Sequence, residues 1–230
     1  MEKEEILAYA KNLMERAETD KVFEDYRSGI NALNEAVRFL EKHLEDYNKQ
    51  VEISDKHIRE FKIRDRNEIA ERIANYYGMI GGQYRRDGEI DKAITAYDRG
   101  LRYEANPLYK ISNSYCLTNS ISLRVIQRGK IDGEIRKKTQ DAISVINEQV
   151  QVIRKDDWWA RADLGLLYLL NNDPANSEQN FEKFGQKGAR REDYVSVITV
   201  LRVLSASLKK NSSKEANLIE SAISKLSKNI

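Results

Sequence analysis

The chain has 230 residues, of which 33% are charged and 40% hydrophobic, and its 39 basic and 37 acidic side chains leave a net charge of +2. This near-balance gives no strong electrostatic field for nucleic acid, and the single cysteine, Cys116, excludes an internal disulfide. No apolar run approaches the roughly 18 residues of a membrane-spanning helix. With only 2 prolines and 11 glycines, the composition favours amphipathic helices.

The first 64 residues are predicted to be helical. Apolar residues recur at helical spacing over residues 2–18 and again over 22–49. Residues 50–64 are less periodic and predict a short helix followed by a connection. The acidic, amphipathic start of the chain lacks the apolar segment of a signal peptide, so a cytoplasmic location is expected.

The stretch from Ile73 to Pro107 carries the most regular pattern in the chain. Its spacing is Tyr77-x2-Ile80-Gly81-x2-Tyr84, then Ala93-x3-Tyr97, then Pro107. The pattern resembles the tetratricopeptide (TPR) repeat, a pair of packed helices. Because Gly81 has no side chain, a partner helix can approach closely there, with Ala93 opposite and Tyr97 filling the space between successive pairs. These residues are predicted to serve packing.

A different face of the same predicted helix carries candidate binding residues. Asn75, Arg85 and Arg86 lie away from the packing positions, and the first helices of such pairs line the concave side of an array. Two adjacent guanidinium groups suit a carboxylate or phosphate of a partner peptide. The alternative is a solvated basic edge without a partner.

The next pair of helices is predicted over residues 107–128 and 131–154, split at Gly129. Gly81 and Gly165 are 84 residues apart, whereas two regular repeats would place them about 68 apart. No loop signal interrupts the intervening sequence. The extra residues are therefore expected to lengthen these two helices, which makes the array irregular.

A second, weaker match to the repeat begins at Trp158. Leu164-Gly165-x2-Tyr168 and Phe181 keep the spacing, with Arg161 in place of the aromatic residue and Ser177 in place of the alanine. The other face of this helix is apolar, and its stripe comprises Trp159, Ala162, Leu166, Leu169 and Leu170. Helices from residues 191–228 are expected to cover this stripe; docking of another protein is the alternative.

A more specific resemblance covers Asn106 to about Asp193. The segments `NPLYKISNSYCLTNS`, `DDWWARADLGLLYLLNND` and `NFEKF` resemble the TPR-like domain that adjoins TRAF-binding in apoptosis signal-regulating kinases and in bacterial relatives. Tyr109, Asn113, Asp157, Trp159 and Asp173 fill comparable places. Ser112, Ser114, Asp163 and Asn172 depart from that pattern. The resemblance implies a regulatory interaction domain working beside a separate effector protein, with Asn113 and Trp159 on the partner-binding surface.

No set of residues points to catalysis or to a metal. The chain has two histidines, His43 and His57, and one cysteine, which cannot form a zinc site of the Cys and His type. No Gly-x-Ser-x-Gly nucleophile motif occurs. Cys116 is expected to be a buried small residue. No catalytic residue, metal or cofactor is predicted.

The sequence thus predicts an all-α, TPR-like helical-hairpin solenoid of ten or eleven helices in a single domain over residues 1–230. Residues 1–64 form N-terminal helices, 65–190 the repeat core and 191–230 the capping helices. The predicted function is non-catalytic binding of a partner protein or peptide, as an adaptor or regulatory subunit, through Asn75, Arg85, Arg86, Asn113 and Trp159.

Two other functional classes stay open. A nucleic-acid-associated helical protein would use the basic cluster Arg59–Arg66 with Arg85 and Arg86, although Glu60, Asp65 and Glu68 dilute that cluster. An enzyme is the third alternative, because a fold alone does not exclude an activity. Whether the chain self-associates is also open.

Overall fold

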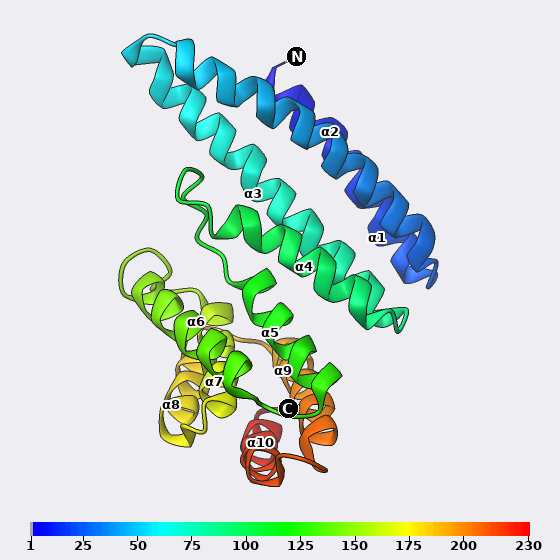
Figure 1. Ribbon diagram of the computed structural model, residues 1–230, viewed down its shortest axis with the longest axis vertical. Helices are drawn as coiled ribbons and strands as arrows, with labels where there is room; N and C mark the ends of the chain where they lie inside the picture. The colour runs from blue at the N-terminus through cyan, green and yellow to red at the C-terminus, as the bar shows by residue number, and fades with distance from the viewer. Residues whose placement is uncertain (1) are drawn as a thin grey trace. The chain divides into compact units, whose positions relative to one another are not determined.

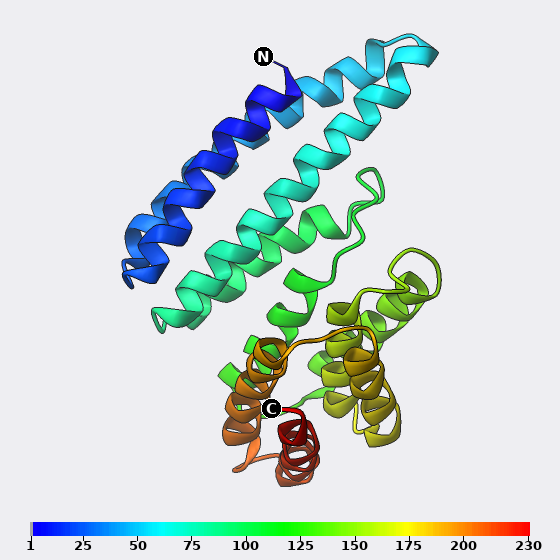
Figure 2. The same cartoon turned by 180° about the vertical axis from the view of Figure 1, so that it is seen from behind.

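The computed structural model describes residues 2–230, and over that range its regular secondary structure consists of ten α-helices and one short 3-10 helix. Figures 1 and 2 show the helices from two sides. The predicted all-α class and helix number are confirmed. The chain divides into two compact units, Met1–Cys116 and Leu117–Ile230. The single-domain description with boundaries near 64 and 190 stays a prediction. None of the helices in residues 2–230 is long and apolar enough to span a bilayer.

The first unit is built from four long helices in succession. They are α1 (Lys3–Val22), α2 (Tyr26–Ile53), α3 (Lys56–Arg86) and α4 (Ile90–Glu104). Each packs against the next one along the chain (Figure 1). Their shared core includes Leu33, Leu40, Ile69 and Ile73, all of which are fully buried.

The prediction for residues 50–64 was wrong, because α2 and α3 run through almost the whole segment. Only Ser54 and Asp55 separate them, and the Ser54 hydroxyl and amide both donate to the carbonyl of Gln50 at the end of α2. The apolar side chains here are exposed, at 83% for Ile53 and 61% for Phe61. Without a buried stripe the sequence shows no helical period.

The α3–α4 hairpin confirms the TPR-like pattern at the atomic level. A β-carbon built on Gly81 would lie 2.8 Å from carbon atoms of the Tyr97 ring, so only glycine leaves room for this ring. Tyr97 thus packs within its own hairpin, against Gly81, and does not simply fill the space between pairs. The hairpin turns at Gly88, whose φ of 79° favours glycine.

The predicted helix over 107–128 begins only at Tyr115, and residues 106–114 form an ordered connection. Helix α5 spans Tyr115–Arg128. Tyr109 and Ile111 of the connection are buried, and Arg66 donates to the carbonyl of Leu108 and lies over the Tyr109 ring. The expectation that two longer helices absorb the extra residues was therefore wrong, since a loop takes up much of the length.

The second unit contains the rest of α5 and the remaining helices. These are α6 (Gly133–Val152), α7 (Trp158–Leu170), α8 (Pro174–Gln186), α9 (Arg191–Leu208), α10 (Ser213–Leu226) and the 3-10 helix η1 (Ser227–Asn229). The α7–α8 hairpin repeats the close approach of α3–α4, because a β-carbon on Gly165 would lie 2.7 Å from the Phe181 ring. Ser177, at the alanine position, donates its hydroxyl to the Gly165 carbonyl at 2.8 Å.

The apolar stripe of α7 is covered within the second unit. Ala162, Leu166, Leu169 and Leu170 are buried in one core with residues of α9 and α10, among them Leu201, Leu204, Ile219 and Ile223. Trp159 differs, with 42% of its surface exposed. Burial of the four aliphatic members of the stripe is therefore observed, and their cover by the C-terminal helices in particular stays a prediction.

Candidate functional site

Helix α3 presents two nearly opposite faces. Asn75, Gly78 and Gly82 follow one another at i, i+3 and i+7 on one face, and Tyr77 and Tyr84 lie on the other. The first face contains two glycines, Gly78 and Gly82, within the helix. No side chain of their own covers the helix backbone at these two positions. The start of α5 covers part of this face.

Asn75 and Asn113, two of the predicted site residues, are brought together. The side-chain amide of Asn113 donates to Asn75 Oδ1 at 3.0 Å. Asn113 Oδ1 in turn accepts from the backbone N–H groups of Ser114 and Tyr115 at 2.8 and 3.0 Å. Both amides have partners inside the chain, and the arrangement fixes where Tyr115 begins α5. Their role in holding a partner stays a prediction.

Tyr115 lies directly on Gly78. Its ring carbons are 2.8 and 3.0 Å from the position of a β-carbon on Gly78, so any larger residue there would displace the ring. The ring also makes an edge contact with Tyr97, with centroids 5.9 Å apart and planes at 68°. Tyr115 is 44% exposed, so one side of it faces solvent.

Three polar groups gather above Gly82. A β-carbon at Gly82 would lie 3.4 Å from Arg86 Nη1 and 3.8 Å from the hydroxyl oxygens of both Tyr97 and Tyr115. We call this space, bounded by Gly82, Arg86, Tyr97 and Tyr115, the Gly82 cradle. The hydroxyl of Tyr97 is buried and interacts with the neighbouring Tyr115, so Arg86 and Tyr115 form the exposed part of the cradle.

The electrostatics of the cradle suit an anion. Burial, followed by the neighbouring Tyr115, raises the pKa of Tyr97, which keeps the phenol protonated and able to donate. Arg85 is half-buried and its charge acts to lower that pKa, whereas Arg86 is exposed. No carboxylate within residues 2–230 forms an ion pair with Arg85 or Arg86. Guanidinium and phenol donors together can hold a carboxylate.

Trp159, the fifth predicted site residue, belongs to the second unit. Its backbone N–H donates to Asp157 Oδ1 at 2.9 Å at the start of α7, and its ring centroid is 6.1 Å from that of Phe184. The remaining four predicted residues lie in the first unit. Trp159 is thus an exposed aromatic residue of the second unit, and a role for it in partner binding stays a prediction.

Sequence reasoning missed Tyr97, Tyr115 and Gly82 as members of the site. The available signal was the pair Gly78 and Gly82, one turn apart on a soluble helix. Such glycines cost about 0.5–1 kcal/mol each relative to alanine, which indicates a close approach by another group. Only the structure reveals that tyrosines make this approach.

Neither the single cysteine nor the metal-ligating side chains in the described part of the chain form a reactive site. Cys116 is buried, and burial followed by the nearby Glu104 raises the pKa of its thiol, which disfavours the nucleophilic thiolate. Within residues 2–230 no three His, Cys, Asp or Glu side chains cluster in a way that could hold a metal ion. The cradle therefore offers binding by charge and hydrogen bonds.

Comparison with known proteins gives little at the level of sequence. No protein-family model matches the chain, and no curated protein matches it. Among solved structures, BtubC (BKLC) from P. vanneervenii is 14% identical, with 99% of this chain and 91% of that chain covered and a TM-score of 0.41. The TPR2AB domain of yeast Sti1, solved as a pHSP90 complex, is 13% identical over 96% and 99%, with a TM-score of 0.21. At such scores neither similarity bears on the function of this chain.

Proposed function

We propose that the chain is a protein-interaction module that binds a partner protein or peptide through the Gly82 cradle. The observation that carries the proposal is the convergence of Arg86, Tyr97 and Tyr115 on a residue without a side chain. Arg86 and Tyr115 are exposed at the edge of this arrangement, where they would donate hydrogen bonds to a carboxylate. An acidic side chain or the C-terminus of the partner would supply this carboxylate.

Arg85, Asn75 and Asn113 support this site in different ways. Arg85 adds positive charge at the end of α3, where cations also interact favourably with the helix dipole. Asn75 and Asn113 hold Tyr115 over Gly78. The partner would therefore contact the exposed Arg86 and Tyr115 directly, while the buried Tyr97 and the two asparagines keep the cradle in shape.

In the cell, the chain would act as an adaptor or regulatory subunit in a cytoplasmic complex, beside a separate effector protein. The resemblance of residues 106–193 to the TPR-like domain of apoptosis signal-regulating kinases supports a regulatory role. Trp159, exposed on α7, would supply an additional aromatic contact to such a partner.

Nucleic-acid binding is less well supported by the same structure. Arg66 of the basic cluster is not accessible to nucleic acid, because it is buried and donates to Asn67 and to the Leu108 carbonyl. The exposed remainder, including Arg59 and Arg64, alternates with acidic residues. A few exposed cations interleaved with carboxylates give little of the counterion release on which such binding depends.

The test compares partner capture by three purified forms of the chain. The three forms are the wild type, a double Arg85→Ala, Arg86→Ala variant and a control double Arg59→Ala, Arg64→Ala variant. The two variants lose the same amount of positive charge. We expect the same protein partner to co-purify with the wild type and the control, and to be lost from the Arg85/Arg86 variant. Equal capture by all three folded forms, or capture of RNA alone, would reject the proposal.

A further inference from the structure

We propose that the groove between α2 and α4 is a second binding site, which takes an extended acidic peptide segment of four or five residues. This groove lies on the face of α3 nearly opposite the Gly82 cradle. It is therefore independent of the site described above, and both could be occupied at once.

The groove consists of three adjoining cavities in the first unit. Their volumes are about 540, 170 and 230 Å³. The first two share Asn34, Tyr77 and Arg99, and the last two share Tyr84 and Lys92. Because neighbouring cavities share lining residues, they form one continuous depression along the α2–α4 boundary.

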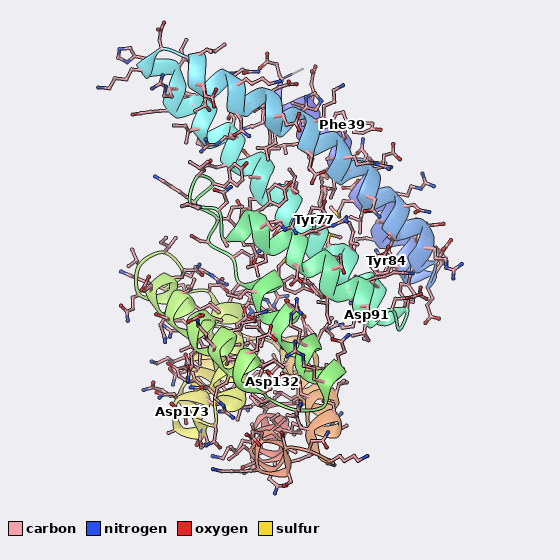
Figure 3. All side chains as sticks on the ribbon, viewed as in Figure 1. Phe39, Tyr77, Tyr84, Asp91, Asp132 and Asp173 are labelled. Atoms are coloured by element: carbon pink, nitrogen blue, oxygen red, sulfur yellow. The ribbon has the colours of Figure 1, made fainter. Side chains whose placement is uncertain are left out.

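Helix α3 forms the floor of the groove. Tyr77, Ile80 and Tyr84 line it from below, and Figure 3 shows Tyr77 and Tyr84 between α4 and α2. Tyr77 and Ile80 are buried and close the floor, and the partly exposed ring of Tyr84 offers apolar contact area there. The walls, in contrast, are polar.

The cavity at one end of the groove has a net positive charge, because three arginines and two glutamates line it. Its two carboxylates already accept hydrogen bonds, Glu35 from Tyr9 at 2.9 Å and Glu41 from Tyr77 and Tyr103 at 3.0 and 2.8 Å. Arg16 and Arg38 line the same cavity, are exposed, and make no ion pair or hydrogen bond within the described chain, residues 2–230.

A third guanidinium completes this end. Arg99 reaches in from α4, close enough to Tyr77 to influence its hydroxyl. Arginines from α1, α2 and α4 thus line one cavity and outnumber its two carboxylates, each of which also accepts a hydrogen bond from a tyrosine. The ligand chemistry that fits is a carboxylate, which accepts paired hydrogen bonds from guanidinium groups.

Two asparagines suit the backbone of an extended peptide. Asn31 and Asn34 lie along the α2 wall, and each side-chain amide offers both a donor and an acceptor. An extended peptide presents the same two groups from its main chain. Asparagine side chains on the wall can therefore bind such a peptide irrespective of its side chains.

The length of the groove sets the length of the ligand. Its α4 wall runs from Glu89 to Arg99, ten helical steps of about 1.5 Å or roughly 15 Å. An extended chain advances about 3.3 Å per residue, so four or five residues fill it. At the far end Arg27 and Lys92 are balanced by Asp87 and Glu89, and Lys92 is paired with Glu89 at 3.3 Å. The net positive charge is therefore at the other end, which places the acidic residues of the ligand near Arg38 and Arg99.

The experiment uses the full chain and a fluorescein-labelled pentaglutamate peptide, followed by fluorescence anisotropy at low salt. Pentaglutamine of the same length is the neutral control. The test variant is Arg38→Ala with Arg99→Ala, and the matched variant Arg59→Ala with Arg64→Ala removes the same charge outside the groove. Thermal unfolding of each variant verifies that it is folded.

We expect pentaglutamate to bind the wild type and the matched variant, and to bind the Arg38/Arg99 variant about tenfold more weakly or worse. In NMR spectra the side-chain amides of Asn31 and Asn34 should shift on peptide addition. Equal binding of pentaglutamate and pentaglutamine, no binding, or shifts confined to Asn75 and Asn113 would overturn the proposal. Loss of binding in the Arg85/Arg86 variant alone would assign the peptide to the Gly82 cradle and overturn it as well.

Discussion

The ring of Tyr97 lies on the bare backbone of Gly81, with three of its carbon atoms 2.8 to 2.9 Å from the position that a β-carbon would take. Real β-carbons are not found so close to ring atoms, so the α3–α4 hairpin cannot keep this geometry with any other residue at 81. Gly82, the next residue, has its nearest neighbours at 3.4 to 3.8 Å. Two adjacent glycines in one helix thus meet different environments.

Alanine substitutions at these two positions should have opposite effects on stability. Gly81→Ala forces the Tyr97 ring to move, and such overpacking costs about 1–3 kcal/mol, more than the roughly 0.5–1 kcal/mol that alanine gains in a helix. Gly82→Ala keeps that gain without a clash. Urea unfolding should therefore show a lower free energy of unfolding for Gly81→Ala and an equal or higher one for Gly82→Ala. The same sign for both would contradict the packing.

Asn113 should matter for stability through its cap and for the site through Tyr115. Asn113→Ala removes the acceptor for two backbone N–H groups, and loss of such a cap costs about 0.5–2 kcal/mol. Asn113→Asp keeps the acceptor but cannot donate to Asn75. Hydrogen exchange should therefore accelerate at the start of α5 in Asn113→Ala and much less in Asn113→Asp. Unchanged exchange in both would show that the cap does not hold Tyr115.

The stability of the first unit should fall at alkaline pH through Tyr77. Burial, followed by the neighbouring Glu41, raises the pKa of Tyr77 to about 12, above the value of about 10 in an unfolded chain. The unfolded state then loses its proton first, so the stabilisation present below pH 10 declines as pH rises from about 10 to 12. Melting temperatures across this range should decline less steeply in Tyr77→Phe. Parallel curves for the two proteins would refute this role.

Cys116 should react slowly with thiol reagents in the native protein. Its side chain is buried, its pKa is raised by burial, and its sulfur lies 3.6 Å from the Ala74 carbonyl oxygen. Alkylation by iodoacetamide should proceed at a small fraction of the rate measured in denaturant, because it requires local opening. Rapid labelling of the folded chain would show that the start of α5 is not packed as described.

The repeat hairpins could be predicted from the sequence because their packing depends on local spacing. Gly81 with Tyr97, and Gly165 with Phe181, carry the information within one helical pair. The stripe on α7 was also predictable, since aliphatic residues at helical spacing must be covered. In each case the pattern and its partner lie within a few turns of each other or within one amphipathic helix.

The connection 106–114, the position of Tyr115 and the helical run through residues 50–64 could not be predicted, because no local sequence pattern encodes the contacts that determine them. The connection 106–114 is held by Arg66, some forty residues earlier, through Leu108 and Tyr109. Tyr115 reaches Gly78 only because Asn113 ends that connection. The helical run through residues 50–64 has exposed apolar side chains and so lacks the buried stripe on which periodicity depends. Sequence therefore predicted Asn75, Arg85, Arg86 and Asn113 as candidates without their tyrosine partners.

The most direct test of the Gly82 cradle fills it without changing any charge. Gly82→Leu would place branched carbons where Arg86, Tyr97 and Tyr115 converge, and Gly82→Ala adds one methyl group that the space accommodates. The measurement is quantitative capture of the co-purifying partner by the wild type and both variants, each verified as folded by its melting temperature. The proposed function predicts that capture is lost in Gly82→Leu and weakened in Gly82→Ala, whose methyl group takes up part of the same space. Full capture by a folded Gly82→Leu variant would contradict it.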